Sequence, residues 1–120
     1  MRDIKILLVQ EIGTMTGEFL NMMRNAGLIV LGVAETGDDA VRIATEKEPD
    51  IVLIDARLRV GMTSAQVADA LASLDRAPGI IYITFNKNDV PNTPSHPYVL
   101  RPFSLEEITK KIQEVLKIQP

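Results

Sequence analysis

Five short apolar runs divide the chain, and within them apolar residues follow one another instead of alternating with polar ones. These runs are Ile4–Val9, Leu28–Val33, Ile51–Ile54, Ile80–Thr84 and Tyr98–Leu100. A strand that is covered on both faces has this continuous pattern, which is typical of parallel sheets. We therefore expect five buried strands.

Helical patterns lie between these runs. The spacing of apolar residues predicts two helices, over Met15–Ala26 and Asp38–Lys47. Capping boxes predict the starts of two more, at Thr63 with Gln66 and at Ser104 with Glu107. Strands that alternate with helices form right-handed βαβ units. The sequence thus predicts an α/β fold with a doubly wound, five-stranded parallel sheet of order 2-1-3-4-5, which is flavodoxin-like.

The connection before the last strand breaks this alternation. Residues Asn86–Pro97 include Pro91, Pro94 and Pro97. Proline removes a helical hydrogen bond and restricts the residue before it. We expect a degenerate fourth helix here, either a loop or one helical turn, and a solvated His96 within it.

Composition narrows the class of protein. The 120 residues suit one domain spanning 1–120, and the 46% of apolar residues can fill its core. The net charge of −3, with both signs mixed along the chain, argues against direct nucleic-acid binding. There is no cysteine and only one histidine, which excludes disulfides and a zinc site. With neither a signal peptide nor a membrane span in the sequence, we expect a cytoplasmic protein.

Polar residues follow the predicted strands at one end. Gln10 and Glu11 follow the first strand, Asp55 the third, and Arg101 the fifth, while Thr84 ends the fourth. Ligands of open parallel sheets bind beyond the carboxyl ends of the strands, so these side chains should converge. Carboxylates, a hydroxyl and a guanidinium around one point suit phosphoryl transfer.

These residues stand in segments that resemble response-regulator receiver domains over almost the whole chain. The segments are ILLV followed by QE, PDIVLID, YIT and YVLRPF. The resemblance implies that Asp55 is the phosphoacceptor, that Thr84 grips the phosphoryl group, and that Tyr98 is the aromatic switch residue. It also implies a cis peptide between Arg101 and Pro102, and Mg²⁺ bound by Glu11, Asp55 and the backbone carbonyl of Arg57.

The chain departs from the family pattern around this site. Gln10 stands where the family usually has an acidic residue, so it can be only a weak metal ligand, and the affinity for Mg²⁺ should fall. Arg101 replaces the usual lysine and is larger and planar, although it binds phosphate well. Phe85 replaces a small residue and is expected to narrow access to Asp55.

Three functions compete at this point. The first is a phosphorylation switch, not an enzyme in its own right, which takes a phosphoryl group from a histidine kinase or phosphotransfer protein and acts on an unknown output protein. The second is a pseudo-receiver, in which Arg57 or Arg101 holds Asp55 and binding needs no phosphate. The shortened fourth crossover leaves the oligomeric state open, including a homodimer.

The third is a flavodoxin-like electron carrier. Gly13–Gly17 resembles part of a flavin phosphate loop, because hydroxyls and backbone N–H groups at a helix start favour phosphate. Glu18 would repel that phosphate, and the chain has no tryptophan to stack on a flavin. Capping of the first helix by Thr14 or Thr16 is the simpler explanation of this segment.

Overall fold

A computed structural model describes residues 3–11, 17–92 and 96–117 of the chain. The strands are β1 (Lys5–Val9), β2 (Ile29–Ala34), β3 (Ile51–Asp55), β4 (Gly79–Thr84) and β5 (Tyr98–Leu100). The helices are α1 (Gly17–Asn25), α2 (Gly37–Lys47), α3 (Ser64–Ala72) and α4 (Leu105–Leu116), with the 3₁₀ turn η1 (Lys87–Asp89). Every predicted strand is present within one residue of its expected bounds.

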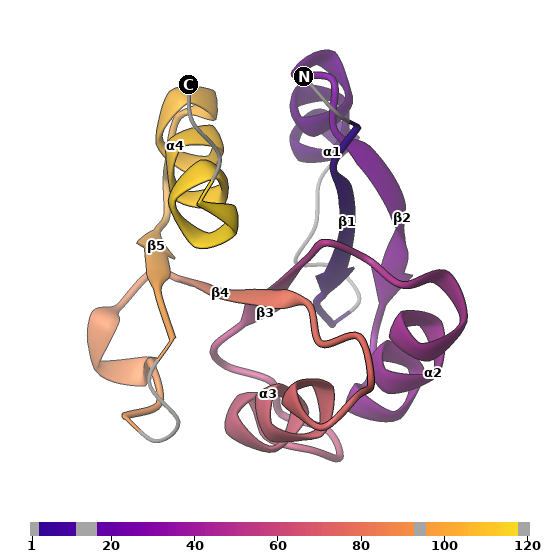
Figure 1. The fold of residues 1–120 in the computed structure, drawn as a ribbon. Coiled ribbons are helices and arrows are strands. Elements are labelled where there is room, and N and C mark those ends of the chain that lie inside the picture. The colour runs from indigo at the N-terminus through magenta and orange to yellow at the C-terminus, as the bar shows by residue number, and fades with distance from the viewer. Residues whose placement is uncertain (1–2, 12–16, 93–95, 118–120) are drawn as a thin grey trace.

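The strands form one parallel sheet in the order β2-β1-β3-β4-β5, as predicted. Helices α1 and α4 cover one face of this sheet, and α2 and α3 cover the other (Figure 1). This two-sided cover explains why the strands are continuously apolar. The fold class predicted from the sequence is confirmed.

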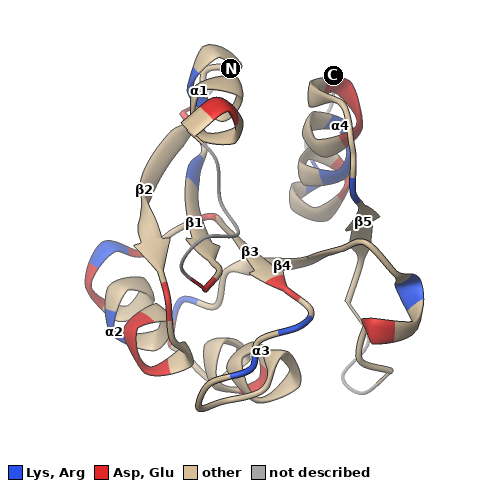
Figure 2. Ribbon diagram, turned by 180° about the vertical axis from the view of Figure 1, so that it is seen from behind, with Lys and Arg blue, Asp and Glu red and all other residues tan. Residues whose placement is uncertain are grey.

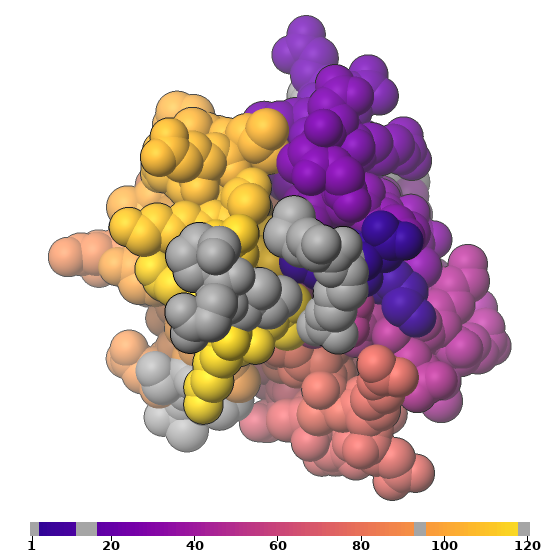
Figure 3. Space-filling model, turned by 45° about the horizontal axis from the view of Figure 1, so that its top comes forward, coloured from indigo at the N-terminus to yellow at the C-terminus, as the bar shows by residue number. Residues whose placement is uncertain are grey.

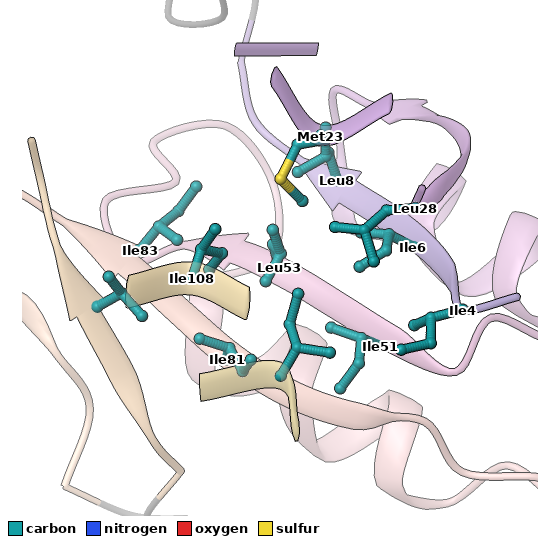
Figure 4. Packing of buried hydrophobic residues seen from close by; sticks show 12 residues of the cluster. Ile4, Ile6, Leu8, Met23, Leu28, Ile51, Leu53, Ile81, Ile83 and Ile108 are labelled. Carbon is teal, nitrogen blue, oxygen red and sulfur yellow. The ribbon is translucent and has the colours of Figure 1, made fainter. Parts of the chain in front are cut away.

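Successive strand residues point to opposite faces and so divide the core in two. Along β1, Ile6 and Leu8 pack under α1 and α4, whereas Leu7 and Val9 pack under α2 and α3. In Figure 4, Met23 from α1 and Ile108 from α4 point toward the sheet from the first side. Both layers are closely filled, which fixes the sheet as a rigid support for its carboxyl edge.

Side-chain caps set the helix starts. The Thr63 and Ser104 hydroxyls each accept a backbone N–H three residues on, and both reciprocal capping-box bonds are present. Helix α2 begins one residue earlier than predicted, because Thr36 caps it by accepting the Asp39 N–H at 3.2 Å. The start predicted for the first helix at Met15 lies outside the described residues, as do Thr14 and Thr16.

The crossover from β4 to β5 contains little helix. Within its described part, 86–92 and 96–97, the only helical turn is η1, with Asn86 as its cap. The prediction of a loop or a single turn is confirmed for these residues. As a result, β5 lies at an edge of the sheet whose cover comes from α4 on one face (Figure 1).

The two helices of the first layer meet near the start of α4. The rings of Phe19 and Phe103 pack edge to face with centroids 5.5 Å apart. In the space-filling view of Figure 3, the purple surface of α1 adjoins the orange surface that leads into α4.

No helix in the described part of the chain is both long and apolar enough to cross a bilayer.

Gly37 offers a test of the packing between α2 and α3. A Cβ at this position would lie 2.8 Å from Cβ of Met62 and 2.8 Å from Cγ2 of Val67. We expect Gly37→Ala to lower the free energy of unfolding by about 1–3 kcal/mol, as overpacked cores do. Urea denaturation measures this change.

Gly32→Ala is the matched control, because a Cβ at Gly32 would meet no atom within 4 Å. Its effect should be neutral or stabilising by about 0.5–1 kcal/mol, since alanine has less backbone freedom to lose. Equal losses in both variants would contradict the packing described here.

Candidate anion-binding and phosphoacceptor cleft

A cleft of about 420 Å³ opens at the carboxyl edge of the sheet. Its lining consists of Glu11, Asp55, Arg57, Arg59, Thr84, Phe85 and Arg101. Glu11, Asp55, Thr84 and Arg101 are thus brought together as the sequence predicts. Of the other predicted site residues, Arg57 also lines this cleft, whereas Gln10 and Tyr98 do not.

Asp55 is the last residue of β3 and is partly buried at the mouth of the cleft. Its Oδ1 accepts the backbone N–H of Arg57 at 2.9 Å, a bond that turns the chain away from the strand. The following residue, Ala56, donates its N–H to the carbonyl of Ile83, which ties the turn to β4. The carboxylate is therefore held in place by the backbone on both sides.

Glu11 reaches across to the loop that follows Asp55. Its Oε2 accepts the backbone N–H groups of Arg59 at 2.7 Å and Val60 at 3.0 Å. Two such bonds to one oxygen are strong because the acceptor is charged. Glu11 thus holds the loop after β3 near the end of β1, through the N–H groups of residues 59 and 60, and it also lines the cleft.

Gln10 is fully buried, and neither its amide oxygen nor its amide nitrogen has a hydrogen-bond partner. Only its backbone is engaged, through an N–H bond to the carbonyl of Ala34 at 2.9 Å. The structure does not place this residue at the cleft, so its predicted role as a weak metal ligand has no geometric support.

Three guanidinium groups share the cleft with the two carboxylates. Figure 2 shows acidic residues at the carboxyl ends of β1 and β3, and basic residues in the loop after β3. The sequence reasoning missed Arg59; its signal was the alternation Arg57-Leu58-Arg59 directly after the phosphoacceptor position. The Arg57 side chain points to Asp89 of η1, with Nε and Oδ2 3.7 Å apart.

Arg101 is the most buried of these cations. Burial lowers its pKa, and the negative charge of Asp55 opposes that shift. Its Nη2 is buried without a hydrogen-bond partner, and its Cζ lies 5.6 Å from the centre of the Phe85 ring, within cation–π range. No ion pair joins Asp55 to Arg57 or Arg101 among the described contacts, although the charge of Asp55 acts on Arg101.

Phe85 contributes an aromatic ring to the cleft. Its side chain is 75% exposed and lies against Arg101 at the rim. It lines the same cleft as Asp55, so the predicted narrowing of the approach to Asp55 stays a prediction. Most of the ring faces solvent, where it is available to a partner.

Thr84 is buried at the end of β4, and its hydroxyl is satisfied locally. Oγ1 donates to the carbonyl of Asn86 at 3.1 Å and accepts the Asn86 N–H at 3.2 Å.

Tyr98 is 39% exposed and lines a separate hollow of about 690 Å³ between β5 and α4. That hollow is larger than the cleft but lies away from Asp55, so we place the chemistry in the smaller one.

The peptide between Arg101 and Pro102 is cis, as the resemblance implies. The neighbouring strand β4 positions Arg101, because the backbone N–H of Arg101 donates to the carbonyl of Thr84 at 2.7 Å. The segment Gly13–Thr16, which carries the flavin-loop alternative, lies outside the described residues.

Solved structures similar to this one are receiver domains. The signal receiver domain of a modulated diguanylate cyclase from Desulfovibrio desulfuricans superposes with a TM-score of 0.84 and 23% identity, covering 97% of this chain and 95% of that one. The receiver domain of the sensor histidine kinase PA1611 from Pseudomonas aeruginosa gives 0.83 and 23%, covering 97% and 99%; that structure has magnesium coordinated in its active-site cleft. The chain has the receiver-domain fold.

A sequence relative points the same way. The transcriptional regulatory protein PdtaR of Mycobacterium tuberculosis is 24% identical over 115 residues, or 91% of this chain. The chain spans about half of that protein, 55% of its length. No protein-family model matches the chain.

The cleft of this receiver fold is a poor match for a resident Mg²⁺. Mg²⁺ binds through oxygen ligands, chiefly carboxylates. Glu11 Oε2 already accepts two N–H groups, and Gln10 is neutral and stands outside the lining. Within the described ranges, no group of three or more acidic or histidine side chains is placed to hold a metal. Three arginines at the same cleft add repulsion.

His96 differs from the sequence expectation, which had it solvated. Its ring packs edge to face on Tyr82, with centroids 5.9 Å apart, and its Nε2 is buried without a partner. Burial lowers the pKa of His96, and Asp69 opposes the shift. The sequence could not show this, because the contact joins the crossover to β4.

Gln10 provides the first test of this part of the structure. Replacing a buried, unpaired polar group with an apolar one of similar shape is neutral or stabilising. We expect Gln10→Met to raise the free energy of unfolding by about 1 kcal/mol. Gln113→Met, at a half-buried position of α4, should change it by less than about 0.5 kcal/mol. A clear loss of stability in Gln10→Met would show that the amide has a partner.

His96 provides the second test. Unfolded histidine takes up a proton near pH 6.5, whereas the folded state holds His96 neutral to lower pH. Stability should therefore be full well above about pH 6.5 and decline as the pH falls below that value. In His96→Gln this part of the decline should disappear, which urea midpoints across the range would reveal. An equal slope in both proteins would contradict the burial of the imidazole.

Proposed function

We propose that this chain is a signalling receiver, and not an enzyme in its own right, in which Asp55 accepts a phosphoryl group from a histidine kinase or a phosphotransfer protein. The observation that carries the proposal is the position of Asp55. It is partly buried at the end of β3 and shares its cleft with Thr84 and Arg101. The receiver-domain structures that resemble this one support the assignment.

The chemistry needs one free carboxylate oxygen. Oδ1 of Asp55 holds the Arg57 N–H, so Oδ2 is the oxygen that attacks phosphorus. With a phosphohistidine donor, an O–P bond forms, the N–P bond breaks, and the imidazole leaves with the bonding pair and is then protonated. The cleft arginines stabilise the charge on the transferring oxygens, a function suited to guanidinium groups.

The response then passes to the outer strands. A phosphoryl group on Asp55 gives the Thr84 hydroxyl a stronger acceptor than the Asn86 carbonyl it now contacts. As Thr84 turns toward the phosphate, Tyr98 leaves the hollow beside α4 and moves inward. The surface of β5 and α4 changes, and this change is what an output protein would detect.

Mg²⁺ is expected to assist only weakly. Asp55, Glu11 and the Arg57 carbonyl are the groups that would hold it, and the magnesium in the PA1611 receiver gives a precedent in the same fold. We assign it no step, because the donor set described above is short of carboxylates.

Acetyl phosphate provides the test. Incubation with this donor should add one phosphoryl mass to the protein, with acetate as the leaving group. The gain should be absent in Asp55→Asn and retained in Asp75→Asn, which alters an exposed aspartate outside the cleft. Intact-protein mass spectrometry, with Mg²⁺ or with EDTA, measures both.

Gln10→Asp extends the experiment. Because the structure buries position 10 outside the cleft lining, the new carboxylate should leave the Mg²⁺ dependence of the phosphoryl gain as it is in the wild type. If no donor phosphorylates the wild type with or without Mg²⁺, the proposal fails and the pseudo-receiver alternative replaces it. Partner binding in that case would be indifferent to Asp55→Asn.

A further inference from the structure

The cleft is cationic before any ligand enters it. Its lining contains three arginines, Arg57, Arg59 and Arg101, and two carboxylate residues, Glu11 and Asp55. The chain as a whole carries a net charge of −3. The excess of positive charge in the cleft lining is therefore opposite in sign to the net charge of the chain.

Neither carboxylate neutralises Arg101 by direct contact. The described bonds of Glu11 Oε2 run to the loop backbone at residues 59 and 60, and Asp55 Oδ1 is turned to the N–H of Arg57. Of the cations, Arg57 has an ion-pair partner outside the cleft, in Asp89. The positive charge of Arg101 thus has no counter-charge within ion-pair distance among the described residues.

Arg101 is also short of an acceptor. Its Nη2 is buried and makes no hydrogen bond, and its Cζ lies 5.6 Å from the centre of the Phe85 ring. A buried guanidinium donor left unpaired is costly, because it has lost water without gaining an acceptor. An oxyanion in the cleft would remove that cost, since guanidinium groups bind phosphate-type oxygens in a fork.

We propose that this cleft binds a small phosphate-type oxyanion non-covalently and without a divalent cation, with Arg101 as the principal donor and Arg59 as a second. The inference deepens the proposed function and rests on its assignment of the cleft, but it does not require transfer to Asp55. The arginines take the place that a metal ion would otherwise hold. A volume of about 420 Å³ accommodates an anion of this size.

Titration of the full chain with inorganic phosphate in EDTA, at constant ionic strength, tests the proposal. Calorimetry or amide chemical shifts should give saturable binding, and added Mg²⁺ should not tighten it. Acetate, with a single charge and two oxygens, should bind more weakly. Absence of binding in EDTA, binding that requires Mg²⁺, or equal affinity for acetate would overturn the proposal.

Variants assign the donors. Arg101→Gln should weaken phosphate binding by about tenfold or more, the usual effect of losing a charge-assisted hydrogen bond. Arg59→Gln, at an exposed position, should weaken it by a smaller factor and provides the test if Arg101→Gln does not fold. Arg42→Gln is the matched control: Arg42 pairs with Asp39 on α2 and should leave the affinity unchanged. Unchanged affinity in both Arg101→Gln and Arg59→Gln would overturn the assignment.

Asp55→Asn separates this inference from the proposed function. The substitution abolishes covalent phosphorylation, but it should tighten free phosphate severalfold, because it removes a negative charge from the cleft. Phosphate binding without a phosphoryl mass gain would refute only the proposed function. A mass gain without phosphate binding would refute only this inference.

Discussion

The parallel pairing of β3 between β1 and β4 is the constraint on which the cleft depends. Val9 pairs with Ile54, and Asp55 pairs with Ile83, so the three strands end within two residues of one another. Because parallel strands all point the same way, the residues that follow or end them face one opening. The buried layers on both faces hold this register, since a slip by one residue would exchange the two apolar sets.

The charge at this opening distinguishes the chain from the pattern it resembles. An acidic position is occupied by Gln10, which is buried with an unsatisfied amide. A lysine position is occupied by Arg101, and two further arginines stand in the loop after Asp55. Each change makes the opening less favourable for a bound cation and more favourable for a bound anion. The receiver fold is thus kept while the ion it favours is altered.

The sequence predicts the strands, their order, two caps and the convergence at the carboxyl edge, because these features arise from local pattern and from the rules of parallel sheets. It does not predict that Glu11 binds the loop backbone at 59 and 60, nor that His96 packs on Tyr82. Both contacts join segments far apart in the chain. Their geometry depends on how the layers pack, which residue spacing does not encode.

The contact between Arg57 and Asp89 joins the loop after Asp55 to the single helical turn η1 of the crossover before β5. The Arg57 side chain is 59% exposed and that of Asp89 is 34% exposed, and their atoms are 3.7 Å apart, so the attraction is modest and is screened by salt. This ion pair therefore joins the crossover before β5 to the loop beside the cleft, while Val90 and His96 pack the same crossover against the core. Raising the ionic strength should weaken the ion pair between Arg57 and Asp89. The position of the crossover should therefore depend on salt concentration, whereas the packing of the apolar layers should not.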